Sequence, residues 1–388
     1  MDASDVLLTQ WGEQVKQIWS GMHQYRQESL ALAVLGIVLA GNAVMQRVAE
    51  TLHERLSNPP KVSSYERRLQ RLIDNKDVNV TDWWERFLQH ALPYWDKRGA
   101  TLVLDCTPYN QSFTIVFVGI LVQKRLLPLA WEIMPQAEKW EEGQWQIVDR
   151  LFGQVSKYLH AHSVTLLADR GLTALPLIRL CERYHWHYVL RIQNDEYCRR
   201  SFRTFYRDWQ RGCDFLLKKG TSWYGNVLLW KEHGFACSLS ACWDPGCEEA
   251  WFLISDLPAS PRRVRVYALR MRVEATFQDT KSRRWCIESS QLCDARHLNH
   301  WLLVIFLSFW WTTHLGASCK HHGHAKEFDR TDRYDKSLLR LGHLWVKEMI
   351  KRANQRMRQQ SLVEAPRMAN CLPFHRTKDG LRFSISLS

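Results

Sequence analysis

The stretch TLVLDCTPYNQSFTIVFVGILVQKRLLPLAWEIM, residues 101–134, decides the fold of this chain. It holds three largely apolar runs that are typical of strands, at 101–105, 113–122 and 125–134. The turn-prone PYNQS separates the first two runs and Gln123-Lys124 separates the last two, as expected for hairpin connections. The stretch therefore predicts a three-stranded meander whose first strand ends at Asp105.

The elements that follow predict how this meander is extended. Residues 141–160 have the apolar spacing of an amphipathic helix, 164–168 (VTLLA) form a short buried strand, 175–184 a helix and 187–192 (HYVLRI) another strand. Three strands, helix, strand, helix, strand is the order of a ribonuclease H-like α/β core. A Rossmann sheet is disfavoured, because it needs helical crossovers from the start and no G-x-G-x-x-G occurs.

The remaining segments indicate five regions along the chain. A helical N-terminal DNA-binding region (1–98) precedes the first core segment (99–193), a mostly β insertion (194–262), the second core segment (263–320) and a basic helical C-terminal region (321–388). In the first region, the apolar run 34–39 leads through Gly41-Asn42 to a helical spacing at Val44, Val48 and Leu52. This pattern fits a helix-turn-helix or an amphipathic pair in a small bundle, and both interpretations stay open.

Composition narrows the class of protein. The chain has 388 residues, a formal charge of +13 and 46% hydrophobic residues, which is typical of a globular protein with a basic surface and makes nucleic acid the leading partner. The apolar stretches 29–45 and 301–315 are shorter than a bilayer requires, so we expect buried helices and no membrane partner. Eleven scattered Cys and no secretory signal favour a reduced, cytoplasmic protein.

The segment RVRVYALRMRVEATFQDTKSRRW, residues 263–285, carries the clearest chemical pattern. As part of a long helix from Val264, it places Tyr267, Arg270, Glu274 and Lys281 within about 60° of one another, at about 100° per residue. An apolar stripe adjoins them. The row therefore lies at the edge of a buried face, although Arg270 and Glu274 at i,i+4 are also a common stabilising pair.

Two aspartates end predicted core strands, Asp105 after TLVL and Asp169 after VTLLA. Taken singly, each could simply cap a turn. Together with Glu274 on a basic protein they suit metal-dependent phosphoryl transfer, because clustered carboxylates need divalent cations to offset their repulsion. Two ions can activate the attacking oxygen and stabilise the leaving one. Lys281 and Arg270 would hold DNA phosphates nearby.

These residues resemble a known family, the DDE transposases of the insertion-sequence four family, of the Tn-five type. Tyr267, Arg270, Glu274 and Lys281 match its Y-x-x-R-x-x-x-E-x-x-x-x-x-x-K signature, and LDCT and LADRGL match its two aspartate motifs. The resemblance covers about residues 100–315. It implies a ribonuclease H-like fold with a β insertion between the second Asp and the Glu. It also implies two Mg²⁺ or Mn²⁺ ions and cut-and-paste DNA transposition by strand cleavage, hairpin formation and strand transfer.

The resemblance also implies a role for each matching residue. The catalytic, metal-binding triad would be Asp105, Asp169 and Glu274, and the DNA contacts would be Tyr267, Arg270, Lys281, Arg191 and Trp251. Trp251 would stack on a flipped base, although Trp243 is an alternative and an ordinary core role fits either one. The implied partners are the inverted-repeat DNA at the transposon ends, target DNA and a second copy of the chain, in the bacterial cytosol or nucleoid.

Two other classes of function stay open at this point. A repressor derived from such an enzyme would bind DNA without cutting it, and a metal-dependent nuclease would cut it without strand transfer. Two weaker clusters have simpler interpretations. Cys237, Cys242 and Cys247 lack the usual spacing of a zinc site, and the CKHHGH stretch at 319–324 is predicted to be a solvated linker.

Overall fold

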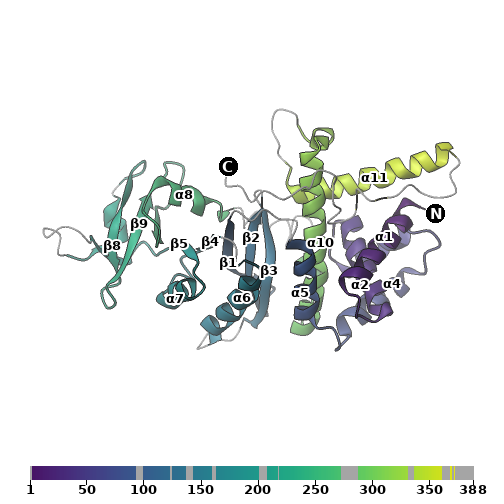
Figure 1. Ribbon diagram of the computed structural model, residues 1–388, viewed down its shortest axis with the longest axis horizontal. Coiled ribbons are helices and arrows are strands. Elements are labelled where there is room, and N and C mark those ends of the chain that lie inside the picture. Colours follow the sequence, from purple (N-terminus) through teal and green to yellow (C-terminus); the bar gives the residue numbers. More distant parts are fainter. Residues whose placement is uncertain are drawn as a thin grey trace.

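The structure is a computed structural model that describes residues 2–92, 99–122, 125–136, 143–159, 163–200, 208–216, 218–271, 287–330, 336–360, 368 and 371. The molecule is elongated, with N-terminal helices at one end, β8 and β9 at the other and the central sheet between them (Figure 1). Residues 1–98, where described, are helical as predicted.

The sheet contains ten strands in the order β3-β2-β1-β4-β5-β10-β9-β8-β6-β7. The first five have the mixed pairing of a ribonuclease H-like core: β1 is antiparallel to β2, β2 is antiparallel to β3, and β1, β4 and β5 run parallel. Their bounds are β1 Ala100–Tyr109, β2 Phe113–Val122, β3 Arg125–Pro135, β4 Val164–Ala168 and β5 His187–Arg191. This arrangement confirms the predicted mixed α/β class.

The same sheet continues beyond β5 through antiparallel strands. β10 pairs with β5, and β9, β8, β6 and β7 follow in turn. Their bounds are β6 Tyr197–Arg200, β7 Gln210–Arg211, β8 Ser222–Leu229, β9 Phe235–Cys242 and β10 Trp251–Ser255, with the 3₁₀ helix η2 at Gly212–Phe215. The regular structure in the described part of residues 194–262 is thus mainly strand, and β10 joins it by hydrogen bonds to the core sheet.

Helices pack against the sheet, and the N-terminal helices lie beyond its β3 edge (Figure 1). The N-terminal ones are α1 Ala3–Ile18, α2 Gln24–Ala40, α3 Met45–Arg55, α4 Val62–Asp74 and α5 Val80–Ala91. The later ones are α6 Gly143–Leu159, α7 Leu175–Arg183, α8 Pro261–Ala268, η4 Ile287–Ser290, α10 Ala295–His321, η5 His324–Glu327 and α11 Leu338–Gln360. Tryptophans join helices to β3: the Trp84 and Trp310 indoles donate hydrogen bonds to the Leu129 and Pro128 carbonyls.

The long helix α10 is the axis of the helical half of the molecule (Figure 1). It is long and apolar enough to cross a membrane, but 94% of its most apolar window is buried inside the protein, as in a core helix. α2 is also buried along most of its length and meets α3 at 89°. α10 crosses α11 backbone to backbone, since a Cβ added to Gly316 would lie 1.8 Å from the Leu338 carbonyl oxygen.

Three sequence-based expectations differ from the structure. β1 does not end at Asp105 but runs to Tyr109, because its pairing with β2 continues there after its pairing with β4 has stopped at Val103. The long helix expected from Val264 begins at Pro261, a residue pre-organised for a first helical turn, and ends already at Ala268 instead of continuing past Arg270, which lies in a 3₁₀ turn. The stretch 319–324 is not a linker: it forms the end of α10 and the start of η5, with Cys319 buried.

Candidate active site

The register of the core strands brings three predicted site residues to one edge of the sheet. Val103 of β1 lies opposite Leu167 of β4, so two residues further along Asp105 comes level with Asp169. Ala168 lies opposite Leu190 of β5, so Asp169 in turn comes level with Arg191. Because β4 ends at Ala168, the two aspartates are adjacent where the strands separate.

Both carboxylates are held in the same way by their own backbone. Oδ1 of Asp105 accepts the amide N–H of Cys106 at 2.9 Å, and Oδ1 of Asp169 accepts that of Arg170 at 2.8 Å. The turn after Asp169 is closed by the Thr173 hydroxyl, which donates to the Asp169 carbonyl. In each aspartate Oδ2 is therefore turned toward the space between the two strands.

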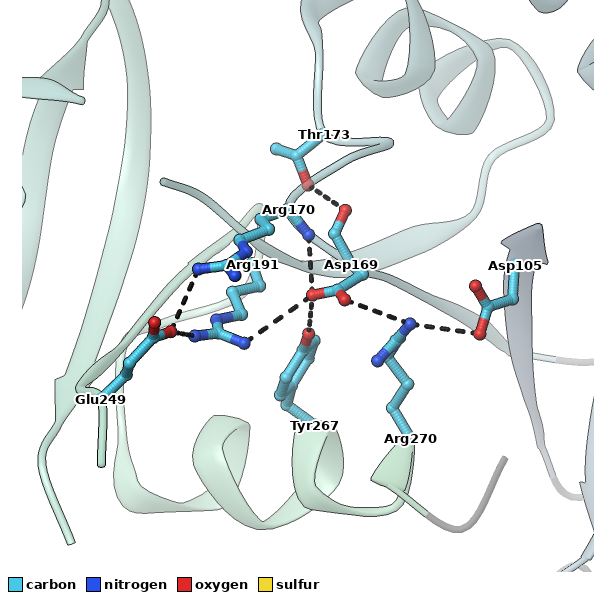
Figure 2. A network of polar contacts seen from close by, with 8 residues as sticks. All are labelled: Asp105, Asp169, Arg170, Thr173, Arg191, Glu249, Tyr267 and Arg270. Carbon is cyan, nitrogen blue, oxygen red and sulfur yellow. Dashed lines mark hydrogen bonds and ion pairs between the residues drawn. The ribbon is translucent and has the colours of Figure 1, made fainter. Parts of the chain in front are cut away.

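Arg270 joins the two aspartates from below (Figure 2). Its Nη2 lies 3.1 Å from Oδ2 of Asp105 and 3.3 Å from Oδ2 of Asp169. α8 ends at Ala268, and a 3₁₀ turn from Tyr267 to the Arg270 amide carries the side chain to this position. Only 8% of the Arg270 side chain is exposed. The two carboxylates thus share one cationic group in a largely desolvated position.

Tyr267 holds the other side of Asp169. The tyrosine is buried, and its hydroxyl donates a hydrogen bond to Oδ1 of Asp169 at 3.1 Å. Burial and the charge of Asp169 raise the pKa of Tyr267 well above its ordinary value, so the hydroxyl stays protonated and remains a donor. Tyr267 and Arg270 therefore act on the same carboxylate from one end of α8.

A second ionic cluster adjoins Asp169 on the side of β5 and includes a residue that the sequence pattern did not reveal. Oε2 of Glu249 accepts hydrogen bonds from Arg191 at 2.8 Å and from Arg170 at 3.0 Å, while Arg191 also lies 3.9 Å from Asp169 (Figure 2). Glu249 belongs to the loop before β10. The opposite charges of Arg191 and Glu249 were the only signal in the sequence, and the two residues are far apart along the chain.

The two candidate stacking tryptophans differ in their surroundings. Trp251, at the start of β10, packs edge-on against Tyr267 with ring centroids 5.3 Å apart. Trp243 instead donates its indole N–H to the Cys247 carbonyl within the loop between β9 and β10. Both are partly buried. Of the two, Trp251 is the one in contact with a residue that touches Asp169.

Glu274 and Lys281, the remaining predicted site residues, lie outside the described residues. Within the part of the chain that is described, no three His, Cys, Asp or Glu side chains group to hold a metal. Asp105 and Asp169 still offer the hard oxygen donors that Mg²⁺ and Mn²⁺ prefer. They face a position that already needs positive charge, which Arg270 supplies here, so the donor set fits a divalent ion.

Comparison with known proteins gives a match to a family model. Residues 122–311 match the family model of the transposase DDE domain. The match supports a DDE transposase. It covers just under half of the chain and includes Asp169, Tyr267 and Arg270 but starts after Asp105. No curated protein matches the chain. A transposase DDE domain implies metal-dependent DNA cleavage and strand transfer, generally with a divalent metal such as Mg²⁺, and transposon DNA as the partner.

Proposed function

We propose that this chain is a transposase of the insertion-sequence four family that moves its element by a cut-and-paste route. The observation that carries the proposal is the meeting of Asp105 and Asp169 at one sheet edge around the guanidinium of Arg270. Carboxylates placed in this way suit two-metal phosphoryl transfer. Glu274, which follows Arg270 by four residues, is the proposed third carboxylate.

In this proposal the bound divalent ions would supply the Lewis acidity that activates the attacking oxygen and stabilises the leaving one. The chain itself does the positioning. The Cys106 and Arg170 amides fix the Asp105 and Asp169 carboxylates, and the Tyr267 hydroxyl fixes Asp169 further. With both aspartates oriented before DNA arrives, little reorganisation is needed at the moment of reaction.

DNA would be held beside these carboxylates. We propose that Arg191, Arg270 and Lys281 contact phosphates of the element end, because guanidinium and ammonium groups are the usual phosphate donors. The proposed sequence is hydrolysis of one strand, attack of the new 3′-OH on the opposite strand to close a hairpin, reopening of the hairpin by water, and joining to target DNA. Trp251, edge-on to Tyr267, would stack on the base flipped out during hairpin closure.

The regions around the site have proposed roles as well. Residues 1–98 would bind the inverted repeat, 194–262 would be the insertion within the core (99–193 and 263–320), and 321–388 would meet DNA or a second subunit. Two element ends must be joined to one target, so a homodimer is the proposed working assembly, acting on DNA in the bacterial cytosol.

The test is a cleavage assay on DNA that carries the repeats flanking this reading frame. Asp105→Asn, Asp169→Asn and Glu274→Gln should each abolish Mg²⁺-dependent cleavage while end binding persists. Asp195→Asn is the matched control, because Asp195 is an exposed aspartate in the turn between β5 and β6. Cleavage that survives in any of the three variants would remove that residue from the site. Binding without nicking would indicate a repressor, and nicking without hairpins or joined products a nuclease.

A further inference from the structure

The ionic cluster beside Asp169 has the form of an occupied phosphate site. Two guanidinium groups, those of Arg170 and Arg191, converge on one carboxylate oxygen, Oε2 of Glu249, at 3.0 and 2.8 Å. They come from different elements, the turn after β4 and the end of β5. Convergent arginines from neighbouring elements are how proteins bind a single phosphate oxygen.

The three side chains of this cluster differ in their exposure to solvent. Arg191 is only 13% exposed and its Nε is buried without a hydrogen-bond partner in the part of the chain that is described, whereas Glu249 is 49% exposed and Arg170 is 40% exposed. The arginine is thus held in place by its surroundings, and the carboxylate reaches it from the solvent side. An exposed acid on a fixed cation can be displaced at small cost.

The loop that carries Glu249 is braced rather than loose. The Asp244 carboxylate accepts the Gly246 amide, the Asp244 carbonyl accepts the Cys247 amide, and the Trp243 indole donates to the Cys247 carbonyl. Two residues after Glu249, Trp251 begins β10 and contacts Tyr267. The carboxylate is therefore presented to the arginines by a defined loop next to the proposed stacking residue.

We propose that Glu249 is an internal mimic of a DNA phosphate: in the DNA-free protein it occupies the position at Arg170 and Arg191 that a backbone phosphate of the substrate takes. This proposal rests on the proposed function, because it needs DNA as the substrate of the site. Glu249 would weaken the binding of DNA that does not fill the site correctly, since any strand must first displace Glu249 from the two arginines. It would also keep Arg191 from closing fully onto Asp169, 3.9 Å away.

The test compares Glu249→Gln with Glu248→Gln. Glu248 is the adjacent residue and is exposed, so both variants remove one negative charge from the same loop. Binding of a fluorescein-labelled duplex of mixed sequence is measured by anisotropy at low and physiological salt, with Ca²⁺ in place of Mg²⁺. Glu249→Gln should bind about three- to tenfold more tightly than Glu248→Gln, since two weak, exposed ion pairs no longer compete.

Salt and a double variant make the readout specific. In Glu249→Gln the released arginines carry counterions that DNA must expel, so log Kd should depend on log salt more steeply by about one unit or more. The gain should shrink when Glu249→Gln is made in an Arg191→Ala background and compared with Arg191→Ala alone, because only the more exposed Arg170–Glu249 pair is then left to compete. Equal affinities and equal salt slopes in the two single Gln variants would overturn the mimic.

The outcomes separate this proposal from the proposed function. If the wild-type protein nicks element ends and Glu249→Gln gains nothing over Glu248→Gln, only the mimic is overturned. If Glu249→Gln gains affinity but no variant ever nicks DNA, the mimic stands on a DNA-binding protein and the transposase proposal falls. If the wild-type protein and both Gln variants bind no DNA, both proposals are overturned.

Discussion

Arg270→Gln is the substitution with the most informative expected result, because its effect on the stability of the protein should depend on whether a metal ion is bound. In the DNA-free protein Nη2 of Arg270 neutralises Asp105 and Asp169 together. Removing this charge leaves two adjacent carboxylates that repel each other. The variant should therefore be less stable than the wild type without metal, and should gain more stability than the wild type when Mn²⁺ is added.

The burial of the three side chains sets the size of the effect. Arg270 is 8% exposed, Asp105 18% and Asp169 33%. Exposed ion pairs contribute less than about 1 kcal/mol and breaking a fully buried pair costs about 3–5 kcal/mol, so this intermediate case should cost about 2 kcal/mol. For a chain of this size the melting temperature should fall by about 3 °C. Without the competing cation, Mn²⁺ affinity should rise about tenfold.

The assay is thermal melting across a Mn²⁺ titration, with Arg265→Gln as the control. Arg265 lies on α8, the helix that precedes Arg270, and is exposed, so this substitution makes the same change of charge away from the carboxylates. It should leave both the metal-free melting temperature and the Mn²⁺ midpoint near the wild-type values. A Mn²⁺ midpoint that moves to higher concentration in Arg270→Gln would refute the reasoning, because Arg270 would then assemble the metal site instead of competing for it.

Three further substitutions test other regions of the structure. Tyr267→Phe removes the donor to Asp169; it should cost about 1 kcal/mol and slow end cleavage several-fold with end binding retained, measured by melting and single-turnover cleavage. Gly316→Ala places a methyl group 1.8 Å from the Leu338 carbonyl oxygen; it should cost at least about 3 kcal/mol and appear as loss of soluble protein. Burial lowers the pKa of His300 below its usual value. The stability of the protein should therefore fall as the pH drops below about 6.5. His300→Asn can keep the hydrogen bond to a carbonyl of α4, and it should reduce this loss of stability in melts from pH 7.5 to 5.

The glycine and histidine substitutions each have a control or a contrary outcome. Gly12→Ala is also within a helix, but apart from its chain neighbours and its own helix backbone no atom of the described residues lies within 4 Å of the added Cβ, so it should leave melting unchanged or raise it slightly. Full solubility of Gly316→Ala would show that α10 and α11 can separate at little cost. An unchanged pH profile in His300→Asn would assign the acid loss to other groups, of which His90, also kept neutral by burial, is the first to test.

The sheet order of the core was predictable from the sequence because each strand carries its own signal. The runs at 113–122 and 125–134 are long and apolar, and turns separate them, so β2 and β3 match the prediction closely. The end of β1 was not predictable, since Pro108 is typical of a turn. It is tolerated in the strand because β1 has lost its β4 neighbour at that point.

Part of the candidate site could be predicted from the sequence, but its contacts could not. Helical spacing placed Tyr267 and Arg270 on one face of a single long helix, and both do reach Asp169, although α8 ends at Ala268 and a 3₁₀ turn carries Arg270 there. Arg270 also reaches Asp105 because the register of β1 against β4 brings the two aspartates side by side. The sequence of one strand does not contain this register. The position of Glu249 depends on the path of a loop, and loops lack the hydrophobic periodicity from which helices and strands are predicted.

The sheet fixes the position of the Glu249 loop relative to the two aspartates. Buried serines lock the strands that connect them: the Ser255 hydroxyl of β10 donates to the Tyr188 carbonyl of β5, and the Ser238 hydroxyl of β9 donates to the Ser255 carbonyl. Strand β5 is in turn paired with β4, which leads directly into Asp169. Glu249 and Trp251 are therefore carried by the same hydrogen-bonded framework as the proposed metal ligands. A substitution that loosens β10 from β5 should consequently disturb DNA handling and cleavage together, even though neither strand contributes a metal ligand.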